Sequence, residues 1–359
     1  MKTGKRGKTG AALVLLVVAV VTCERLHADE GEERAVKAVE KMGGRIIRDE
    51  KAKGKPIVGV DLTFYFGVTG DVDANDLAGT LKELIHLKQL QRLELCGVKV
   101  TGAWRKQLTG LKQIRQLILI RSDVTDAGLR QLAGLTQLEV LDLSFAQVTD
   151  AGLQHLAGLK NLRSLNLDSA KVTGAGLKHL AGLKNLQSLN LDSTKVMGAG
   201  LKHLGRLNQL QKLNLFETNV SGVGLKVLAG LKHLQKLELG ASKVTEVGLR
   251  ELAGLKQLQE LGLAYTHVTD AGLEHVAGLK RLQTLDLRLT KVTDAGLKHL
   301  ARLKQLRELE LYDTRVTDAG LKHLTGLKQL RELDLLDTEV TRKGVAMLQK
   351  ALPKVRIAH

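Results

Sequence analysis

The feature that most constrains the fold of this chain is an internal repeat with a period of 24 residues. Successive units carry a leucine at the same place: Leu138, Leu162, Leu186, Leu210, Leu234, Leu258, Leu282, Leu306 and Leu330. Counting back adds Ile114 and Leu90, which makes eleven units, and a degenerate twelfth precedes them at residues 60–62. A fixed period of roughly 20–50 residues predicts a solenoid, in which each unit packs only against its neighbours.

Two periodicities meet inside each unit, as residues 282–305 (LQTLDLRLTKVTDAGLKHLARLKQ) illustrate. The first leucines end in a two-residue alternation, which predicts a short strand, and the last leucines recur every three residues, which predicts a short helix. Val292 fills the turn between them, and either Thr293 or Asp294 is placed to cap the helix. One strand and one helix cannot bury their apolar faces alone, so we expect an α/β solenoid with an inner parallel sheet and short outer helices.

The segment VTDAGL carries a family resemblance, and it is intact at residues 124–129, 148–153, 268–273, 292–297 and 316–321. It resembles the leucine-rich repeat family, most closely the tandem repeats of exported bacterial proteins, over about residues 57–357. It is also similar to the cysteine-containing subclass found in F-box leucine-rich repeat proteins. Two features depart from that subclass: its cysteine column is mostly Thr or Ser here, and no F-box-like helical domain precedes the repeats.

The resemblance implies a leucine-rich repeat horseshoe whose concave sheet binds a partner. In usual leucine-rich repeats an Asn amide bonds the loop backbone at the position of Thr290. This column holds Thr or Ser in all of the last seven units, and we expect the hydroxyl to act similarly. The likeness to F-box proteins implies a substrate-recognition subunit of a ubiquitin-ligase-like complex as a third, less favoured function.

The chain divides into four predicted segments. Residues 1–28 read as a signal peptide, because Lys2, Lys5, Arg6 and Lys8 precede an apolar run at 11–21 that is shorter than the roughly 20 residues of a membrane span. A cap helix and strand follow at 29–56, then the solenoid at 57–345 and a C-terminal cap at 346–359. We therefore expect export to the periplasm, cell surface or medium. A lipid anchor at Cys23 and an uncleaved anchor are alternatives.

Acidic and basic residues are segregated to different faces of the predicted solenoid. The whole chain carries a net charge of +17. Four columns that flank and separate the strand leucines should face solvent on the concave side. Their forty-four positions contain fourteen acids and five bases, so this face is acidic while the rest of the chain is strongly basic. Stacked acids repel unless a cation or a basic partner offsets them, although a polar sheet surface also resists aggregation.

The candidate binding residues are the acids and aromatics of this concave face. Aromatic residues make up only 2% of the chain, yet four of them fall here, and aromatics are frequent in binding hot spots. The candidates are Asp142, Phe145, Phe216, Glu238, Glu260, Tyr265, Asp286, Glu310, Tyr312 and Asp334. Six acids of this face cluster near the C-terminal end, but their spacing matches no dedicated metal loop, so no metal is predicted. They are Glu308, Glu310, Asp313, Glu332, Asp334 and Asp337.

The predicted outer surface carries columns of basic residues. Two lysine columns read as solvated helix faces: Lys178, Lys202, Lys226, Lys298 and Lys322, and Lys112, Lys160, Lys184, Lys232, Lys256, Lys280, Lys304 and Lys328. A histidine column contains His155, His179, His203, His275, His299 and His323. The lysines could hold an anionic glycan or lipid. Nucleic acid is disfavoured because the aromatic residues that stack on single strands are absent from these columns.

The sequence favours a binding protein over an enzyme. It contains no G-x-S-x-G, P-loop, paired-Cys zinc motif or H-E-x-x-H, so no catalytic residue and no cofactor are predicted. The leading hypothesis is a non-catalytic scaffold whose concave face binds a basic or polar protein or peptide. The alternative is a cell-envelope structural protein that binds anionic glycan or lipid through its basic convex face. The sequence leaves open the partner, the cleavage site, the oligomeric state and the biological process.

Overall fold

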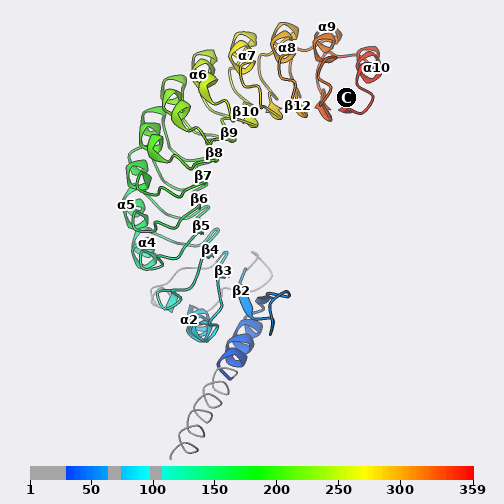
Figure 1. Cartoon of the computed structure of the whole chain (residues 1–359). Helices are drawn as coiled ribbons and strands as arrows, with labels where there is room; N and C mark the ends of the chain where they lie inside the picture. Colours follow the sequence, from blue (N-terminus) through cyan, green and yellow to red (C-terminus); the bar gives the residue numbers. More distant parts are fainter. Residues whose placement is uncertain (1–29, 64–73, 98–106) are drawn as a thin grey trace, which may run out of the picture.

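A computed structural model describes residues 30–63, 74–97 and 107–359 of the chain. The described residues form a crescent in which the strands line the inner side and the short helices the outer side (Figure 1). This arrangement confirms the predicted α/β solenoid. The predicted signal peptide at residues 1–28, with Cys23, lies outside the described residues. Within them, no helix is both long and apolar enough to cross a membrane.

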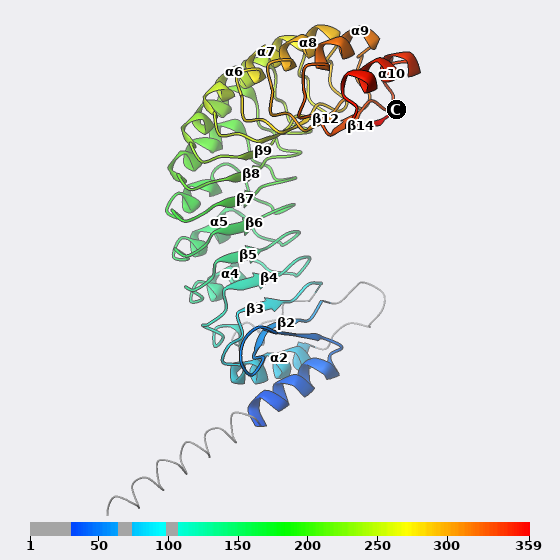
Figure 2. The same cartoon turned by 45° about the vertical axis from the view of Figure 1, so that its right-hand side comes forward.

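The inner side is a single fourteen-stranded sheet whose strands follow chain order (Figure 2). Its strands are β1 (Arg45–Arg48), β2 (Ile57–Asp61), β3 (Arg92–Glu94), β4 (Gln116–Ile118), β5 (Val140–Asp142), β6 (Ser164–Asn166), β7 (Ser188–Asn190), β8 (Lys212–Asn214), β9 (Lys236–Glu238), β10 (Glu260–Gly262), β11 (Thr284–Asp286), β12 (Glu308–Glu310), β13 (Glu332–Asp334) and β14 (Arg356–Ala358). β1 pairs with β2 in an antiparallel manner, and all later pairs are parallel.

The strand register reproduces the sequence period. Paired residues are 24 positions apart from β3 onward, as in Leu261 with Leu285. The β2–β3 pair differs, because Gly59 pairs with Arg92, so the degenerate first unit is longer than the others. Because the shift is constant, each column of the sequence becomes a row of side chains that runs along the crescent.

The outer side combines α-helices with 3₁₀ helices. The α-helices are α2 (Ala74–Glu83), α4 (Asp126–Leu132), α5 (Asp150–Leu153), α6 (Glu246–Glu251), α7 (Asp270–Val276), α8 (Asp294–Leu300), α9 (Asp318–Leu321) and α10 (Arg342–Ala351). The 3₁₀ helices are η1 (Leu84–His86), η2 (Gln154–Leu156), η3 (Gly176–Leu180), η4 (Gly198–Arg206), η5 (Gly222–Gly230), η6 (Leu252–Gly254) and η7 (Lys322–Leu324).

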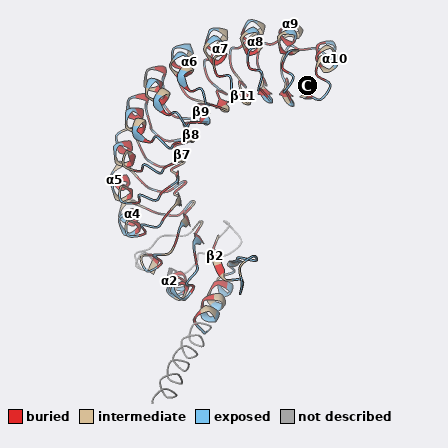
Figure 3. Ribbon diagram, viewed as in Figure 1, coloured by how far each residue is buried: buried red, intermediate tan, exposed pale blue. Residues whose placement is uncertain are grey.

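The core lies between the sheet and the helices and is built almost entirely from leucine and valine (Figure 3). The strand leucines, the helix leucines and the valine that precedes each helix are buried in every fully described unit, as Leu285, Leu300 and Val292 show. Neighbouring units share this core, so an isolated unit would expose its leucines to water. The hydrophobic effect therefore stabilises the stack rather than the single repeat.

The turn after each strand contains a residue in the left-handed conformation, which was not predicted from the sequence. The third residue after the strand adopts the left-handed region in ten successive units, with φ between 48° and 60°. These residues are Arg121, Phe145, Ser169, Ser193, Glu217, Ala241, Tyr265, Leu289, Asp313 and Asp337. The next residue is buried in all but the last of these units, where Thr338 is half-buried. In the last seven units its hydroxyl donates to the strand-leucine carbonyl three residues earlier, as Thr290 does to Leu287 at 2.6 Å. This confirms the predicted role of the Thr and Ser column.

Neighbouring units are joined on the helix side in two different ways. At what we call stapled junctions, an Asp carboxylate accepts hydrogen bonds from the backbone and hydroxyl of the Thr 23 residues later. Asp294 accepts from Thr317 N at 2.8 Å and from Thr317 Oγ1 at 2.7 Å. The stapled pairs are Asp126–Thr149, Asp150–Thr173, Asp270–Thr293, Asp294–Thr317 and Asp318–Thr341.

At the three glycine junctions the Asp is replaced by Gly174, Gly198 or Gly222, and backbones meet directly. A Cβ atom added at Gly224 would lie 2.3 Å from the Cα of Gly198. The helices of these three units, η3 to η5, are entirely 3₁₀ and carry no acid in the first turn. An acid there favours a helix start, and each α-helix of a stapled unit from α4 to α9 begins with Asp.

The prediction that Thr293 or Asp294 caps the helix is confirmed, with Thr293 as the cap. Thr293 is the N-cap and accepts from Ala295 N, whereas Asp294 reaches into the next unit. At the N-terminal end, residues 30–41 are helical and bury Ala35 and Val39. At the C-terminal end, α10 spans the proposed boundary at residue 345, and β14 covers the edge of β13.

Candidate functional site

One column of the concave face, the residue between the two strand leucines of each unit, fixes the turn after the strand. We call it the middle column, and the sequence did not reveal this role. In most units its carboxylate or amide oxygen accepts the backbone N–H two residues later, as Glu238 does from Gly240 at 3.0 Å. The other acceptors are Asp61, Asp142, Asn166, Asn190, Asn214, Asp286 and Asp334. The bond fixes the turn that leads into the left-handed residue. Part of the acidity of the concave face is therefore explained by the fold. Asp61 is buried, and the other side chains of this set are half-buried rather than fully exposed.

The structure brings eight of the ten candidate residues onto one stretch of the concave face. They belong to the six consecutive units from β8 to β13: Phe216, Glu238, Glu260, Tyr265, Asp286, Glu310, Tyr312 and Asp334. Asp142 and Phe145 lie in the unit of β5, three units away. There the Arg121 guanidinium stacks on the Phe145 ring at 5.0 Å, so this aromatic already has a partner within the chain. We call the eight residues the concave cluster.

Two glycines that sequence reasoning missed shape the concave cluster. A Cβ atom at Gly240 would lie 2.7 Å from the Phe216 ring, and one at Gly262 would lie 2.0 Å from the Glu238 carboxylate. The Phe216 ring and the Glu238 carboxylate therefore lie over the backbone of the next unit. The signal was available in the sequence, because Gly240 and Gly262 interrupt columns that are otherwise occupied by larger side chains.

The acids of the concave cluster carry unfavourable negative charge. Burial raises the pKa of Glu238, and the nearby Asp286 adds to this effect. Burial also raises the pKa of Glu310, with Asp334 as the next cause. Paired strands place Asp286 beside Glu310 and Glu310 beside Asp334. Carboxylates whose pKa values are raised in this way favour a partner that supplies positive charge.

Internal cations offset only part of this charge. Arg288 donates to both oxygens of Asp286, at 2.9 and 2.6 Å, and this pairing raises the pKa of the guanidinium. Lys236 pairs with Glu260 at 2.6 Å. Among the described residues no ion pair is formed by Glu238, Glu310 or Asp334. These three carboxylates are therefore the ones with capacity for a basic partner.

The aromatics of the concave cluster differ in exposure because they belong to different columns. Tyr265 occupies the left-handed column and is 55% exposed, whereas Phe216 and Tyr312 precede that column and are half-buried. Asp337 raises the pKa of the Tyr312 hydroxyl. The sequence placed all four aromatics on one face, but it did not distinguish a ring directed into solvent from one packed along the sheet.

The two lysine columns of the outer surface are not equivalent, which corrects their interpretation as two helix faces. The column of Lys160 lies in the turn after the helix, and most of its members donate to backbone carbonyls at the ends of helices. Lys184 reaches Arg206 O at 3.1 Å, and Lys328 reaches Ala351 O at 3.1 Å. Cations stabilise these carbonyls. In contrast, the side chains of the other column are exposed, and their ammonium groups have no hydrogen-bond or ion-pair partner within the part of the chain that the structure describes. These residues are Lys178, Lys202, Lys226, Lys298 and Lys322.

No metal centre is assembled by the described residues, since no three His, Cys, Asp or Glu side chains converge there. The histidine column lies half-buried along the helices. Cys96 is a free thiol, and burial raises its pKa, which makes it a weak nucleophile at neutral pH.

Comparisons with known proteins agree with this architecture. Models described as leucine rich repeat match residues 199–268 and residues 134–157, 158–181 and 280–301. No curated protein matches the chain. An internalin from Listeria monocytogenes is similar in structure, with a TM-score of 0.62 and 20% identity over 86% of this chain and 91% of that one. A leucine-rich repeat protein of Leptospira interrogans has a TM-score of 0.53 and 22% identity over 83% and 95%.

These likenesses concern the fold, and the matched repeats lie within the stack of parallel strands. Solenoids of this kind generally present an extended concave surface to a partner. The 24-residue register, the buried leucine columns and the matched segments together show a leucine-rich repeat solenoid fold.

Proposed function

We propose that this chain is an exported, non-catalytic scaffold that binds a basic protein or peptide at the concave cluster. The observation that carries the proposal is the row Glu238, Asp286, Glu310 and Asp334, in which burial and mutual repulsion raise the pKa of Glu238 and Glu310. Tyr265, exposed beside this row, offers an aromatic contact of the kind that dominates binding hot spots.

Crosslinking with mass spectrometry in the native host tests the proposal. The partners captured by the wild-type chain are compared with those of Tyr265→Ala and Glu310→Lys. We expect each substitution to weaken capture about tenfold or more, since hot-spot truncation typically has this effect. Phe145→Ala is the matched control, because it removes an aromatic from the same face outside the cluster and should change little. Unchanged capture by the two cluster variants would refute the proposal.

Proton release gives a second, independent measurement. A cationic partner favours the ionised carboxylate, so binding should lower the pKa of Glu238 and Glu310 and release protons at mildly acidic pH. Titration calorimetry of the captured partner in two buffers of different ionisation enthalpy measures this release. Glu238→Gln should reduce it, and a complex that takes up protons instead would contradict a basic partner.

The second candidate function is that of a cell-envelope protein that binds anionic glycan or lipid through its basic outer face. It is favoured by the unpaired column that includes Lys202 and Lys298. Salt-sensitive binding to anionic vesicles or glycan, reduced by Lys→Gln changes in this column, is the result it requires. The engagement of the Lys160 column with backbone carbonyls leaves fewer free cations for this function than the sequence suggested.

A further inference from the structure

Two adjoining hollows lie on the helix side where the glycine junctions replace the staples. The first has a volume of about 390 Å³ and the second of about 560 Å³. They are one repeat apart and share Ala199 and Lys202 in their linings. Their combined size falls within the roughly 300–1,000 Å³ range of protein ligand sites. We call them the lysine-rimmed hollows.

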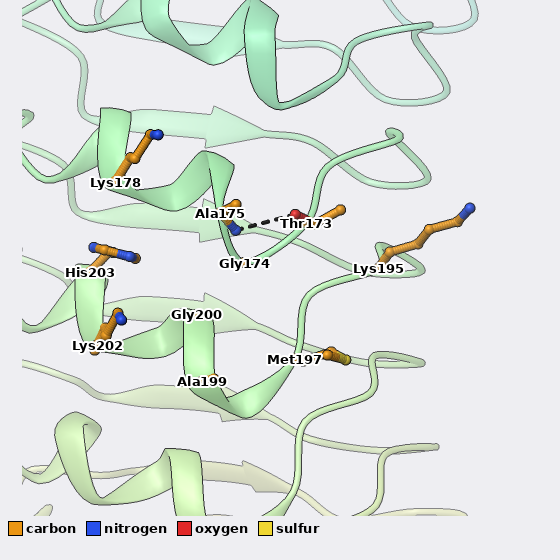
Figure 4. A pocket seen from close by; sticks show the side chains of 10 residues that line it. All are labelled: Thr173, Gly174, Ala175, Lys178, Lys195, Met197, Ala199, Gly200, Lys202 and His203. Atoms are coloured by element: carbon orange, nitrogen blue, oxygen red, sulfur yellow. Dashed lines mark hydrogen bonds between the residues drawn. The ribbon is translucent and has the colours of Figure 1, made fainter.

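The floor of these hollows is apolar. In Figure 4 the floor of the first hollow is formed by Gly174, Ala175, Ala199 and Gly200, which lie between Lys178 and Lys202 on one side and Lys195 and Met197 on the other. Met197 stands where stapled units have Thr, and it is 57% exposed. Asp is absent at residues 174 and 198, and none of the described residues that line the first hollow carries a carboxylate. The Asp150 carboxylate of the preceding unit lies nearby, where it accepts hydrogen bonds from Thr173.

The rim of the hollows is positively charged. Residues 151–245 contain thirteen Lys and Arg but only four Asp and Glu. All four acids lie in the concave columns, at Asp168, Asp192, Glu217 and Glu238, and only Lys212 and Lys236 of the bases accompany them there. Eleven bases therefore remain on the other surfaces of this stretch, where the same stretch contributes no acid.

The local field acts on a neighbouring histidine. Burial lowers the pKa of His203, and Lys202 and Lys178 lower it further. A protonated ring would add to the positive charge of Lys178 and Lys202. The hollows thus combine recessed apolar surface with cations that a partner of opposite charge would satisfy.

We propose that the lysine-rimmed hollows dock an acidic polypeptide segment, with one apolar side chain seated in each hollow and carboxylates paired with Lys178, Lys202 and Lys226. The recessed floor fits protruding side chains better than the flat surface of a bilayer. None of the described residues that line the hollows is Phe, Tyr or Trp, the residues that most often stack on bases, which disfavours a nucleic acid. This site lies on the opposite side of the solenoid from the concave cluster and is independent of it.

Fluorescence anisotropy with three labelled peptides and the full chain tests this proposal. One peptide alternates Glu and Leu, the second contains Glu alone at the same length, and the third alternates Lys and Leu. We expect the Glu–Leu peptide to bind most tightly, the Glu peptide at least about tenfold more weakly, and the Lys–Leu peptide not at this site. Equal binding of the two acidic peptides would show that the apolar floor is not used and would overturn the proposal.

Two substitutions and two matched controls locate the binding. Lys202→Glu reverses the charge shared by both hollows, and Ala199→Gln fills the floor without changing charge. Each should weaken the Glu–Leu peptide about tenfold. Lys298→Glu and Ala295→Gln alter the same two columns in a stapled unit and should change affinity less than about twofold. All four positions are exposed, and circular dichroism verifies that the variants are folded.

Equal losses from Lys202→Glu and Lys298→Glu would attribute binding to general charge attraction and overturn the proposal. Vesicles of equal parts phosphatidylglycerol and phosphatidylcholine serve as a competing probe. If they bind the wild-type chain while the Glu–Leu peptide does not, the surface belongs to a membrane and the proposal is wrong. The concave variant Glu310→Lys should leave peptide binding unchanged, which separates this result from the proposed function.

Discussion

Between Asp270 and Thr341 neighbouring units are joined by side-chain staples, whereas between Gly174 and Gly248 they are joined by direct backbone contact. The leucine core and the sheet register are the same in both regions. A stapled junction satisfies a backbone N–H and a hydroxyl with one carboxylate. A glycine junction omits those bonds and leaves surface hollows. The same repeat therefore forms a surface joined by side-chain hydrogen bonds in one region and a basic surface with hollows in the other.

The largest expected effect comes from adding a methyl group at a glycine junction. In Gly224→Ala the new Cβ would lie 2.3 Å from Gly198 Cα and 2.4 Å from its carbonyl oxygen. We expect a loss of about 3 kcal/mol in the free energy of unfolding, because backbone must shift to relieve the overlap. Urea denaturation followed by circular dichroism measures this loss.

Two matched glycines control this experiment. Gly230→Ala, in the same 3₁₀ helix with nothing within 4 Å, should be neutral or slightly stabilising. At the stapled equivalent, Gly296→Ala, the Cβ meets the Asp270 carboxylate and a Leu273 methyl group. These side-chain atoms can move, so the loss should be smaller than for Gly224→Ala. An equal or larger loss would show that the two junctions do not differ in the way described.

Removing a staple should have the next largest effect. Asp294→Ala leaves Thr317 N–H and its hydroxyl without their acceptor, which should cost about 2 kcal/mol. Asp294→Asn keeps an acceptor for the backbone N–H and should lose less. Hydrogen exchange at the Thr317 amide reports the effect locally. If that amide stays protected in Asp294→Ala, the staple does not hold the junction.

Acid pH should weaken the stapled region more than the glycine region. Hydrogen bonds from the Thr341 backbone and then its hydroxyl lower the pKa of Asp318. A group whose pKa is lower in the folded state stabilises the fold above its unfolded pKa, and this contribution is lost as pH falls through the folded pKa. Amide protection factors near Thr341 should therefore fall below about pH 4 more than those near Gly200. An equal decline in both regions would indicate a general effect of acid and would contradict the prediction. A decline near Thr341 that is absent in Asp318→Asn would attribute the effect to the staple.

Much of the candidate site could be read from the alternation of residues along each strand. The columns that contain Glu238 and Tyr265 were assigned to the concave face, and the register places them there. The sequence did not show which of these side chains are held by contacts within the fold and which are free to contact a partner. A carboxylate in the middle column bonds the turn two residues later, and Phe216 and Glu238 lie over glycines of the next unit. Both contacts depend on backbone geometry that spacing alone does not specify.

The sequence by itself determined the solenoid, its 24-residue register and its buried columns, because hydrophobic burial repeated at a fixed period has one satisfactory arrangement. Only the tertiary structure decided which polar side chains form hydrogen bonds within the fold. Asp294 and Lys184 look like surface residues in the sequence, yet each bonds a neighbouring unit. Lys202 also looks like a surface residue in the sequence, and its ammonium group has no hydrogen-bond or ion-pair partner among the described residues. Such contacts join residues more than twenty positions apart, so their existence depends on how closely two units approach rather than on local pattern.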